Sequence, residues 1–215
     1  MDTFALESSV VIYDDHELFA DSFAIFLERL GIFRSVLIAH DEKEVISLLI
    51  SQSRLGRTYF FLDYYVRNEN SIFLLKDAGR ISKKIKTIIV SGFIKPSLID
   101  YIITQKPWAI INKSSGSNVI IDCLNAIENN ELYLCPVMQE YVEYNKSQKS
   151  RQVPFTSREL HILQYFAEGM SISETALKLN LSKWTIVNHR SNMMRKSGTK
   201  SIVDLLSYAR NMGLI

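Results

Sequence analysis

The N-terminal part of the sequence alternates between short apolar runs and longer segments with helical patterning. Five runs rich in β-branched or aromatic residues lie at 9–13, 35–39, 58–62, 87–90 and 108–112. Short, continuously apolar runs of this kind are typical of strands buried on both faces. Strands that alternate with helices pair in parallel through right-handed crossovers, with helices on both faces of the sheet. The pattern therefore predicts a five-stranded, parallel, doubly wound α/β domain.

Helix signals fill the intervals between the apolar runs. Asp41 followed by Glu44 marks a helix start, Gly31 suits a helix end, and Pro96 suits a first helical turn. We expect helices at residues 16–30, 41–52, 72–81, 96–105 and 117–129. The polar stretch 64–70 predicts a loop.

Polar side chains stand where four of the five runs end, and they are Asp14, Asp15, Asp63, Ser91 and Lys113. Ligands of open parallel sheets bind beyond the carboxyl ends of the strands, so we expect these groups to converge. Crowded carboxylates repel one another, and Mg²⁺, which prefers hard oxygen ligands, relieves that repulsion. An aspartate beside Mg²⁺ can attack a phosphoryl group and form an acyl phosphate, while the lysine and hydroxyl stabilise the phosphoryl oxygens. Each residue alone could be a helix cap or a surface ion pair, but five at matching strand ends indicate a site.

Residues 171–196 predict two short helices with a tight joint. Ser171 and Glu174 form a capping-box pattern at the first helix, and Ser182 can cap the second. Asn180 lies where the first helix would end, since asparagine tolerates the left-handed conformation found there. Thr156 and Glu159 form a second capping-box pattern upstream. Together with a last helix from Ser201, these signals predict four helices packed through Leu160, Leu163, Ala176, Leu179, Ile186 and Met193.

The second helix of this pair has two different faces. Ile186 and Met193 share a side that suits burial. The opposite side carries mixed hydrogen-bonding and apolar groups with basic residues around them, which suits a helix in a DNA major groove. The alternative is an ordinary helical hairpin with a solvated face. The candidate DNA-contacting residues are Ser182, Lys183, Trp184, Thr185, Val187, Asn188, Arg190, Ser191 and Arg195.

The distribution of charge and cysteine agrees with a DNA-binding unit joined to a separate control unit. From residue 153 onward the chain carries eight Lys/Arg and four Asp/Glu, a net of +4, whereas the remainder is mildly acidic at −2. Cys123 and Cys135 form no disulfide framework and do not have metal-site spacing. The sequence has no secretion signal pattern and no apolar run long enough for a bilayer, so we expect a cytoplasmic protein with no membrane partner.

These motifs resemble a known bacterial family. Asp-Asp after the first strand, Asp after the third, Ser after the fourth and Lys after the fifth resemble the receiver domain of two-component response regulators. The segment FTSRELHILQYFAEGMSISETALKLNLSKWTIVNHRSNMMRK resembles the LuxR-type helix-turn-helix. Together they look like the NarL/FixJ family of transcription regulators. The resemblance implies an α/β plus all-α chain, with a flavodoxin-like receiver at 1–131, a linker at 132–152 and a four-helix DNA-binding domain at 153–215.

The resemblance also implies roles and partners. Asp63 would be the phosphoacceptor, and Ser91 and Lys113 would report the phosphoryl group to the rest of the domain. Mg²⁺ would be held by Asp14, Asp15, Asp63 and the carbonyl of Tyr65. A sensor histidine kinase would donate the phosphoryl group, and the active form would be a homodimer on double-stranded DNA. No enzyme activity is expected beyond self-phosphotransfer and autodephosphorylation.

Several positions depart from the family pattern and leave alternatives open. Val66–Arg67 stand where Met-Pro is common, and Asn70–Ser71 stand where Asp-Gly or Asn-Gly is common. Ile110 replaces the switch aromatic residue, and Tyr64 and Tyr65 are bulky for a loop beside a metal site. The first alternative is a DNA-binding regulator with a degenerate receiver that works without phosphorylation. The second is an aspartyl-phosphate enzyme such as a phosphatase, which the absence of a spare His or Glu at a strand end disfavours.

Overall fold

All five apolar runs form strands of one sheet in the computed structural model, which describes residues 7–66, 69–92, 94, 96–148 and 154–215. These strands are β1 (Ser9–Tyr13), β2 (Ser35–Ala39), β3 (Thr58–Asp63), β6 (Ile85–Ser91) and β7 (Ala109–Asn112). Their order is β2-β1-β3-β6-β7, and every neighbouring pair is parallel. The residues of β1, β3 and β7 are all buried, because helices cover both faces of the sheet. The predicted doubly wound α/β fold is confirmed.

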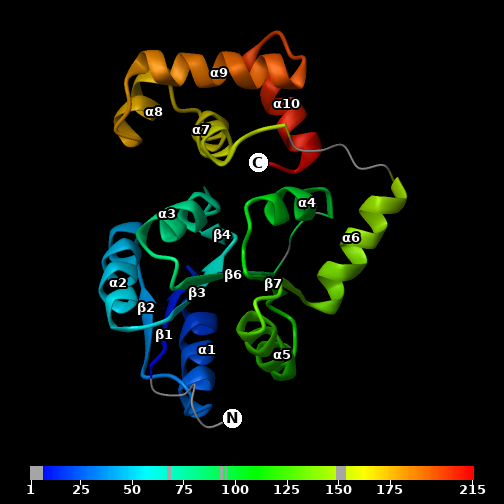
Figure 1. The fold of residues 1–215 in the computed structure, drawn as a ribbon. Helices are drawn as coiled ribbons and strands as arrows, with labels where there is room; N and C mark the ends of the chain where they lie inside the picture. Colours follow the sequence, from blue (N-terminus) through cyan, green and yellow to red (C-terminus); the bar gives the residue numbers. More distant parts are fainter. Residues whose placement is uncertain (1–6, 67–68, 93, 95, 149–153) are drawn as a thin grey trace.

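Figure 1 shows helices on the two faces of this sheet. They are α1 (Glu17–Arg29), α2 (Glu42–Leu55), α3 (Phe73–Ile81), α4 (Pro96–Thr104) and α5 (Ser117–Glu128). Apolar residues of α1 and α5 join one buried cluster with the sheet, and those of α2, α3 and α4 join a second one. The helices start and end within a few residues of the predicted positions, and Asp41 caps α2 by accepting from the backbone N–H of Glu44.

The predicted number of strands was too low. A sixth strand, β8 (Tyr133–Leu134), pairs in parallel with β7 and extends the sheet. The polar loop expected at 64–70 instead contains a small antiparallel pair, β4 (Tyr65–Val66) and β5 (Glu69–Asn70), while Arg67 and residue 68 lie outside the described residues. Two-residue strands are too short to show a period in the sequence, so tertiary pairing alone defines them.

Most of the predicted linker has regular structure. After β8 the chain forms α6 (Pro136–Gln148), with proline at the first helical position. Met138 and Asn145 of α6 are buried against α4, and the Asn145 side-chain amide donates to the Asp100 carboxylate at 3.1 Å. The last part of the predicted linker, 149–152, and residue 153 lie outside the described residues. The domain boundaries at 131 and 152 remain predictions.

The C-terminal part has the four predicted helices, α7 (Ser157–Ala167), α8 (Ile172–Lys178), α9 (Lys183–Ser197) and α10 (Ile202–Met212). Both predicted capping boxes are present, at Thr156 and Ser171, and Ser182 caps α9. Asn180 has the left-handed conformation, with φ of 56°. Of the predicted core, Leu179 is half-buried and the other members are buried. Within the part of the chain that the structure describes, no helix is long and apolar enough to cross a membrane.

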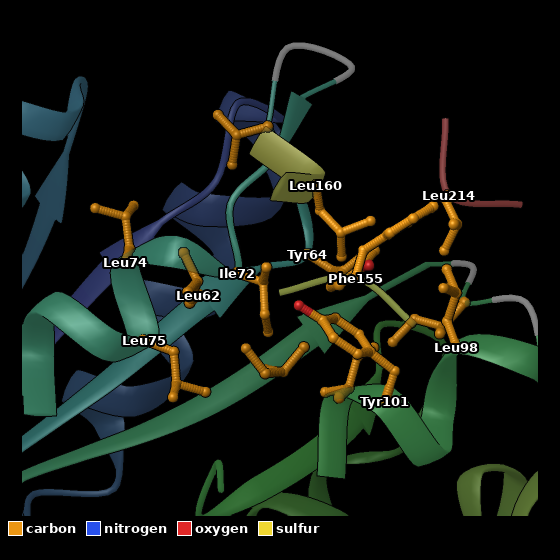
Figure 2. Close-up of a cluster of buried hydrophobic side chains, with 14 of the residues drawn as sticks. Leu62, Tyr64, Ile72, Leu74, Leu75, Leu98, Tyr101, Phe155, Leu160 and Leu214 are labelled. Atoms are coloured by element: carbon orange, nitrogen blue, oxygen red, sulfur yellow. The ribbon is translucent and has the colours of Figure 1, made fainter. Parts of the chain in front are cut away.

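The two parts of the chain pack against each other through a shared apolar cluster. Helix α7 contacts α3 and β5. Figure 2 shows side chains from both parts meeting in this cluster, and the labelled ones include Tyr64, Leu98, Tyr101, Phe155, Leu160 and Leu214. We call this set the interdomain cluster.

Candidate phosphoacceptor site and nucleic-acid interface

The carboxyl ends of three strands bring two aspartates and a lysine into direct contact. Asp14 follows β1, Asp63 ends β3, and Lys113 follows β7. The Lys113 Nζ lies 2.7 Å from Asp14 Oδ2 and 2.8 Å from Asp63 Oδ2. The side chains of Asp14 and Asp63 are only 2% and 3% exposed, so the ammonium compensates two buried carboxylates at once.

The environment of Asp63 changes its proton affinity. Burial raises its pKa to about 6, the hydrogen bond from Lys113 opposes this rise, and the charge of Asp14 adds to it. The backbone N–H of Tyr65 donates to Asp63 Oδ1 at 3.3 Å. Such a carboxylate is more basic than an ordinary aspartate and is still mostly ionised at neutral pH, which suits a nucleophile.

Sequence reasoning missed one residue of this site. The Nδ1 atom of His16 lies 3.1 Å from Asp14 Oδ1, 3.2 Å from Asp15 Oδ1 and 3.9 Å from Asp63 Oδ2. The argument that no spare histidine stands at a strand end was therefore wrong. The signal available in the sequence was adjacency, since His16 directly follows Asp14–Asp15. Ligand atoms of these four residues all lie within 4.8 Å of one another, so they could hold a metal ion.

Ser91 and Tyr65 occupy the same edge of the sheet. Ser91 ends β6, is buried, and stands in register with Asn112 of β7. Asp63 pairs with Val90, the residue before Ser91. Tyr65 contributes its backbone N–H to Asp63. The predicted roles of the Ser91 hydroxyl and the Tyr65 carbonyl remain predictions.

The candidate DNA-contacting face of α9 is open. Ile186 and Met193 are buried in the C-terminal part, as predicted, while Trp184 on the other face is 74% exposed. Figure 1 shows α9 on the side of the C-terminal part that lies away from the sheet. Lys183, Ser191 and Arg195 are exposed as well, and Val187, Asn188 and Arg190 are half-buried.

Two of the candidate residues also form the start of α9. The backbone N–H of Thr185 donates to Ser182 Oγ at 3.0 Å, and the two hydroxyl oxygens are 2.8 Å apart. Their side chains therefore hold the first turn of the helix in place, beside Lys183 and Trp184.

Comparison with known proteins covers both parts of the chain. Residues 153–209 match the family described as bacterial regulatory proteins, luxR family. The Fimbriae Z protein of Salmonella typhimurium (strain LT2) is 26% identical over 214 residues, spanning 97% of this chain and 99% of that protein. The transcriptional regulatory protein UhpA of Escherichia coli (strain K12) is 24% identical over 197 residues, spanning 92% and 95%. The solved RcsB from Salmonella enterica serovar Typhimurium, bound to promoter rprA with a phosphomimetic, has the same fold, with 22% identity, a TM-score of 0.66, and coverage of 93% and 96%.

Residues 153–209 therefore form a domain of the luxR family of bacterial regulatory proteins, and the chain as a whole is similar to response regulators of the NarL/FixJ type. Its N-terminal part is the receiver and its C-terminal part is the LuxR-type helix-turn-helix domain. In this regulator Ile110, which replaces the family's switch aromatic residue, is buried and pairs with Leu134 of β8. The added strand β8 and helix α6 therefore pack against β7, the strand that would carry the aromatic switch residue at position 110.

The loop after Asp63 departs from the family in a way that the structure explains. Tyr64 does not crowd the metal site, because its ring is 1% exposed and lies in the interdomain cluster. Val66 is buried in the same apolar cluster. Ser71 has no positive φ, and its backbone N–H donates to the Tyr64 carbonyl at 3.0 Å. Its hydroxyl also donates to the Asp63 carbonyl, so serine fixes the start of α3 without glycine's backbone freedom.

Proposed function

We propose that this response regulator accepts a phosphoryl group on Asp63 from a sensor histidine kinase and controls transcription through binding of α9 to double-stranded DNA. The observation that carries the proposal is the buried Asp63 carboxylate at the end of β3, in contact with Lys113 and next to a second aspartate. The open polar and basic face of α9 supports the second half of the proposal.

The phosphotransfer chemistry follows from this arrangement. A carboxylate oxygen of Asp63 attacks the phosphorus atom, and the bond from phosphorus to the donor group breaks as the new P–O bond forms. Charge on the phosphoryl oxygens is then balanced by the ammonium of Lys113, which already lies within 2.8 Å of Asp63. Ser91, at the end of the neighbouring strand, would donate its hydroxyl to the same group.

The acidic group fits Mg²⁺ by the chemistry of its donors. Asp14, Asp15 and Asp63 supply hard carboxylate oxygens that lie close enough to share one ion, and the Tyr65 carbonyl would be a further oxygen ligand. When bound, Mg²⁺ would neutralise charge on the phosphoryl oxygens. The carboxylates of Asp14 and Asp63 are buried, so they are already held in place for an ion.

Tyr64 provides a direct route from Asp63 to the DNA-binding domain. It follows the phosphoacceptor in the chain, its backbone N–H donates to the Val90 carbonyl at 3.1 Å, and its ring lies in the interdomain cluster. A shift of the backbone at Asp63 would move this ring against Phe155 and Leu214. We propose that Tyr64 carries the signal that an aromatic residue at 110 carries in other members. Release of the C-terminal domain would then allow two copies to bind DNA as a homodimer, as solved RcsB dimers do.

We assign the site to signalling and not to turnover of an external substrate. Relatives such as UhpA are transcriptional regulatory proteins, and an acyl phosphate on Asp63 would itself be the signal. A regulator should retain radiolabelled phosphate on the protein, whereas a phosphatase should release it during repeated turnover.

The experiment that tests the proposal is intact-mass spectrometry after incubation with acetyl phosphate and Mg²⁺. We expect one added phosphoryl group on the wild type and none on Asp63→Asn. Lys113→Gln should modify slowly and Lys43→Gln, outside the acidic group, should modify normally. Equal modification of wild type and Asp63→Asn would refute the assignment. A wild type that binds DNA equally well with and without the phosphoryl group would instead support the phosphorylation-independent alternative.

A further inference from the structure

His16 stands at the start of α1 but does not cap the helix. It occupies the N-cap position, which favours Asn, Asp, Ser or Thr because their side chains accept a hydrogen bond from the first turn. In this helix, whose residues are all described, the His16 ring makes no such bond. The backbone N–H of His16 donates to Asp14 Oδ1 at 2.9 Å, and the ring turns toward the two aspartates before it. Helix capping therefore does not account for a histidine at this position.

One ring nitrogen of His16 faces groups of both charges. The Nδ1 atom lies 3.1 Å from Asp14 Oδ1 and 3.2 Å from Asp15 Oδ1, and it is also 3.4 Å from Lys113 Nζ. An N–H at this atom would point toward the ammonium, whereas a lone pair would point toward two carboxylate oxygens. Neither arrangement suits all of these neighbours. A divalent cation between Nδ1 and the two Oδ1 atoms removes the conflict with the carboxylates, because all three atoms then direct lone pairs at one positive charge.

The lysine and the histidine contact different carboxylate oxygens. Lys113 contacts Oδ2 of Asp14 and of Asp63, whereas His16 is closest to Oδ1 of Asp14 and of Asp15. Ligand atoms about 2.1 Å from one ion are about 3.0–3.4 Å apart when they are neighbours in octahedral or tetrahedral coordination. The distances from Nδ1 to the two Oδ1 atoms fall within this range. The side chain of His16 is 68% exposed and that of Asp15 is 27% exposed, so an ion can enter this side from solvent.

We infer that His16 is a further ligand of the cation site and favours Zn²⁺ over Mg²⁺ there. The inference rests on the proposed function, because it concerns the same site. Carboxylate oxygens are the ligands that Mg²⁺ prefers, whereas an imidazole nitrogen is a common ligand of Zn²⁺. The three aspartates attract any divalent cation, so His16 determines the preference between two ions and not the existence of the site. Zn²⁺ held through His16 would compete with Mg²⁺ for Asp14 and Asp15.

The test compares the full-length wild type with two histidine variants. Asparagine is a preferred N-cap residue and offers an oxygen ligand, so His16→Asn should keep its thermal midpoint and its affinity for Mg²⁺. His40→Asn is the matched control, because His40 directly follows β2 at the same edge of the sheet and is exposed, but is not one of the clustered residues. Calorimetry gives the dissociation constants of Zn²⁺ and of Mg²⁺ for each protein.

The informative quantity is the ratio of these two constants, since many nitrogen and oxygen sites bind Zn²⁺ tightly. Even outer-shell partners of metal ligands contribute about tenfold to metal affinity, so His16→Asn should weaken Zn²⁺ binding by roughly tenfold or more and change Mg²⁺ binding by less than about threefold. We expect His40→Asn to change neither constant.

Nitrogen NMR identifies the ligand directly. Zn²⁺ is diamagnetic, and a ring nitrogen that binds it changes its chemical shift. The sequence has four histidines. We expect Zn²⁺ to shift the Nδ1 signal of one of them, an excess of Mg²⁺ to reverse that shift, and the signal to be absent from His16→Asn.

Two results would overturn the inference, namely a Zn²⁺ to Mg²⁺ ratio that is the same in His16→Asn as in the wild type, or a His16 Nδ1 signal that Zn²⁺ does not shift. Phosphorylation by acetyl phosphate in Mg²⁺ separates this failure from failure of the proposed function. A wild type that is modified on Asp63 but gives either result overturns only the role of His16. A wild type that is not modified overturns the proposed function, even where His16 binds Zn²⁺.

Discussion

The imidazole of His161 in α7 stacks on the ring of Phe73 in α3, with ring centroids 4.1 Å apart and planes inclined by 6°. This contact joins the DNA-binding domain to the first residue of the helix that follows the phosphoacceptor loop. The Nε2 atom of His161 lies 3.0 Å from the Tyr165 hydroxyl, and Nδ1 is buried without a hydrogen-bond partner among the described residues. Burial lowers the pKa of His161 to about 4, and the charges of Arg158 and Lys178 lower it further. The interface between the domains therefore requires a neutral imidazole.

We predict that acid destabilises this interface through His161. The unfolded chain, with an ordinary histidine pKa near 6.5, binds more protons than the folded chain between pH 6.5 and 4. The stabilisation is complete above about pH 6.5 and is lost as the pH falls toward 4, by on the order of 3 kcal/mol. Urea unfolding from pH 7.5 to 4.5 should show this loss in the wild type and a smaller one in His161→Phe. Because the pKa of Asp63 is raised, its titration stabilises the folded chain as the pH falls, which is opposite to the effect of His161. The informative quantity is therefore the difference in unfolding free energy between the wild type and His161→Phe at each pH. Parallel pH profiles would exclude His161 as the cause.

Tyr64→Leu is predicted to uncouple phosphorylation from DNA binding. Leucine fills much of the buried space but removes the ring that contacts the interdomain cluster, whereas Asp63 and Lys113 stay in place. Phosphorylation by acetyl phosphate should continue, and the gain in DNA affinity on phosphorylation should shrink. Tyr144→Leu, which changes an exposed tyrosine of α6, is the control. A normal gain in DNA affinity in Tyr64→Leu would place the relay elsewhere.

Two substitutions on α9 should impair DNA binding in different ways. Asn188 offers hydrogen bonds to base edges, so Asn188→Ala should cost roughly 1–3 kcal/mol on the cognate site and relax preference at one position. Lys183 is exposed at the helix start, so Lys183→Ala should weaken cognate and scrambled duplexes alike and reduce the salt slope by about one unit. Binding to both duplexes at several salt concentrations distinguishes these effects. The orientation of α9 is wrong if the two variants exchange these behaviours.

Glu159→Ala should destabilise the C-terminal domain. The buried Glu159 carboxylate accepts from the Thr156 backbone N–H at 2.7 Å and from Lys196 Nζ at 2.6 Å, so it caps α7 and holds the end of α9. Losing both interactions should cost about 2–3 kcal/mol by chemical denaturation. Glu174→Ala removes a matching but exposed capping-box residue in α8 and should cost less. A smaller loss for Glu159→Ala than for Glu174→Ala would show that the contact with Lys196 is not stabilising.

The sequence was sufficient for the features that local rules determine. The bounds of β1 and β2 match the predicted runs, because in each strand four continuous apolar residues follow a serine and show no helical period. The capping boxes at Thr156 and Ser171 follow from a fixed spacing of two side chains and the backbone. The convergence of Asp14, Asp63 and Lys113 follows from parallel topology, which brings the ends of distant strands together.

Features that depend on tertiary contacts could not be predicted. The helix α6 has only a few buried residues, among them Met138 and Asn145, and α4 supplies the surface that buries them. The position of the Tyr64 ring depends on the docking of a second domain. His16 stands at a helix start, where no periodicity indicates the direction of a side chain.

The strand β8 and helix α6 have a practical consequence for dividing this chain. They bury Ile110 and the surface of α4, so a fragment that ends at residue 131 would leave β7 as an unpaired edge beside bare apolar side chains. Unprotected edge strands of this kind promote aggregation. A fragment that ends at Gln148 keeps this edge of the sheet covered, although it still removes the partners that bury Tyr64 and Leu98 in the interdomain cluster.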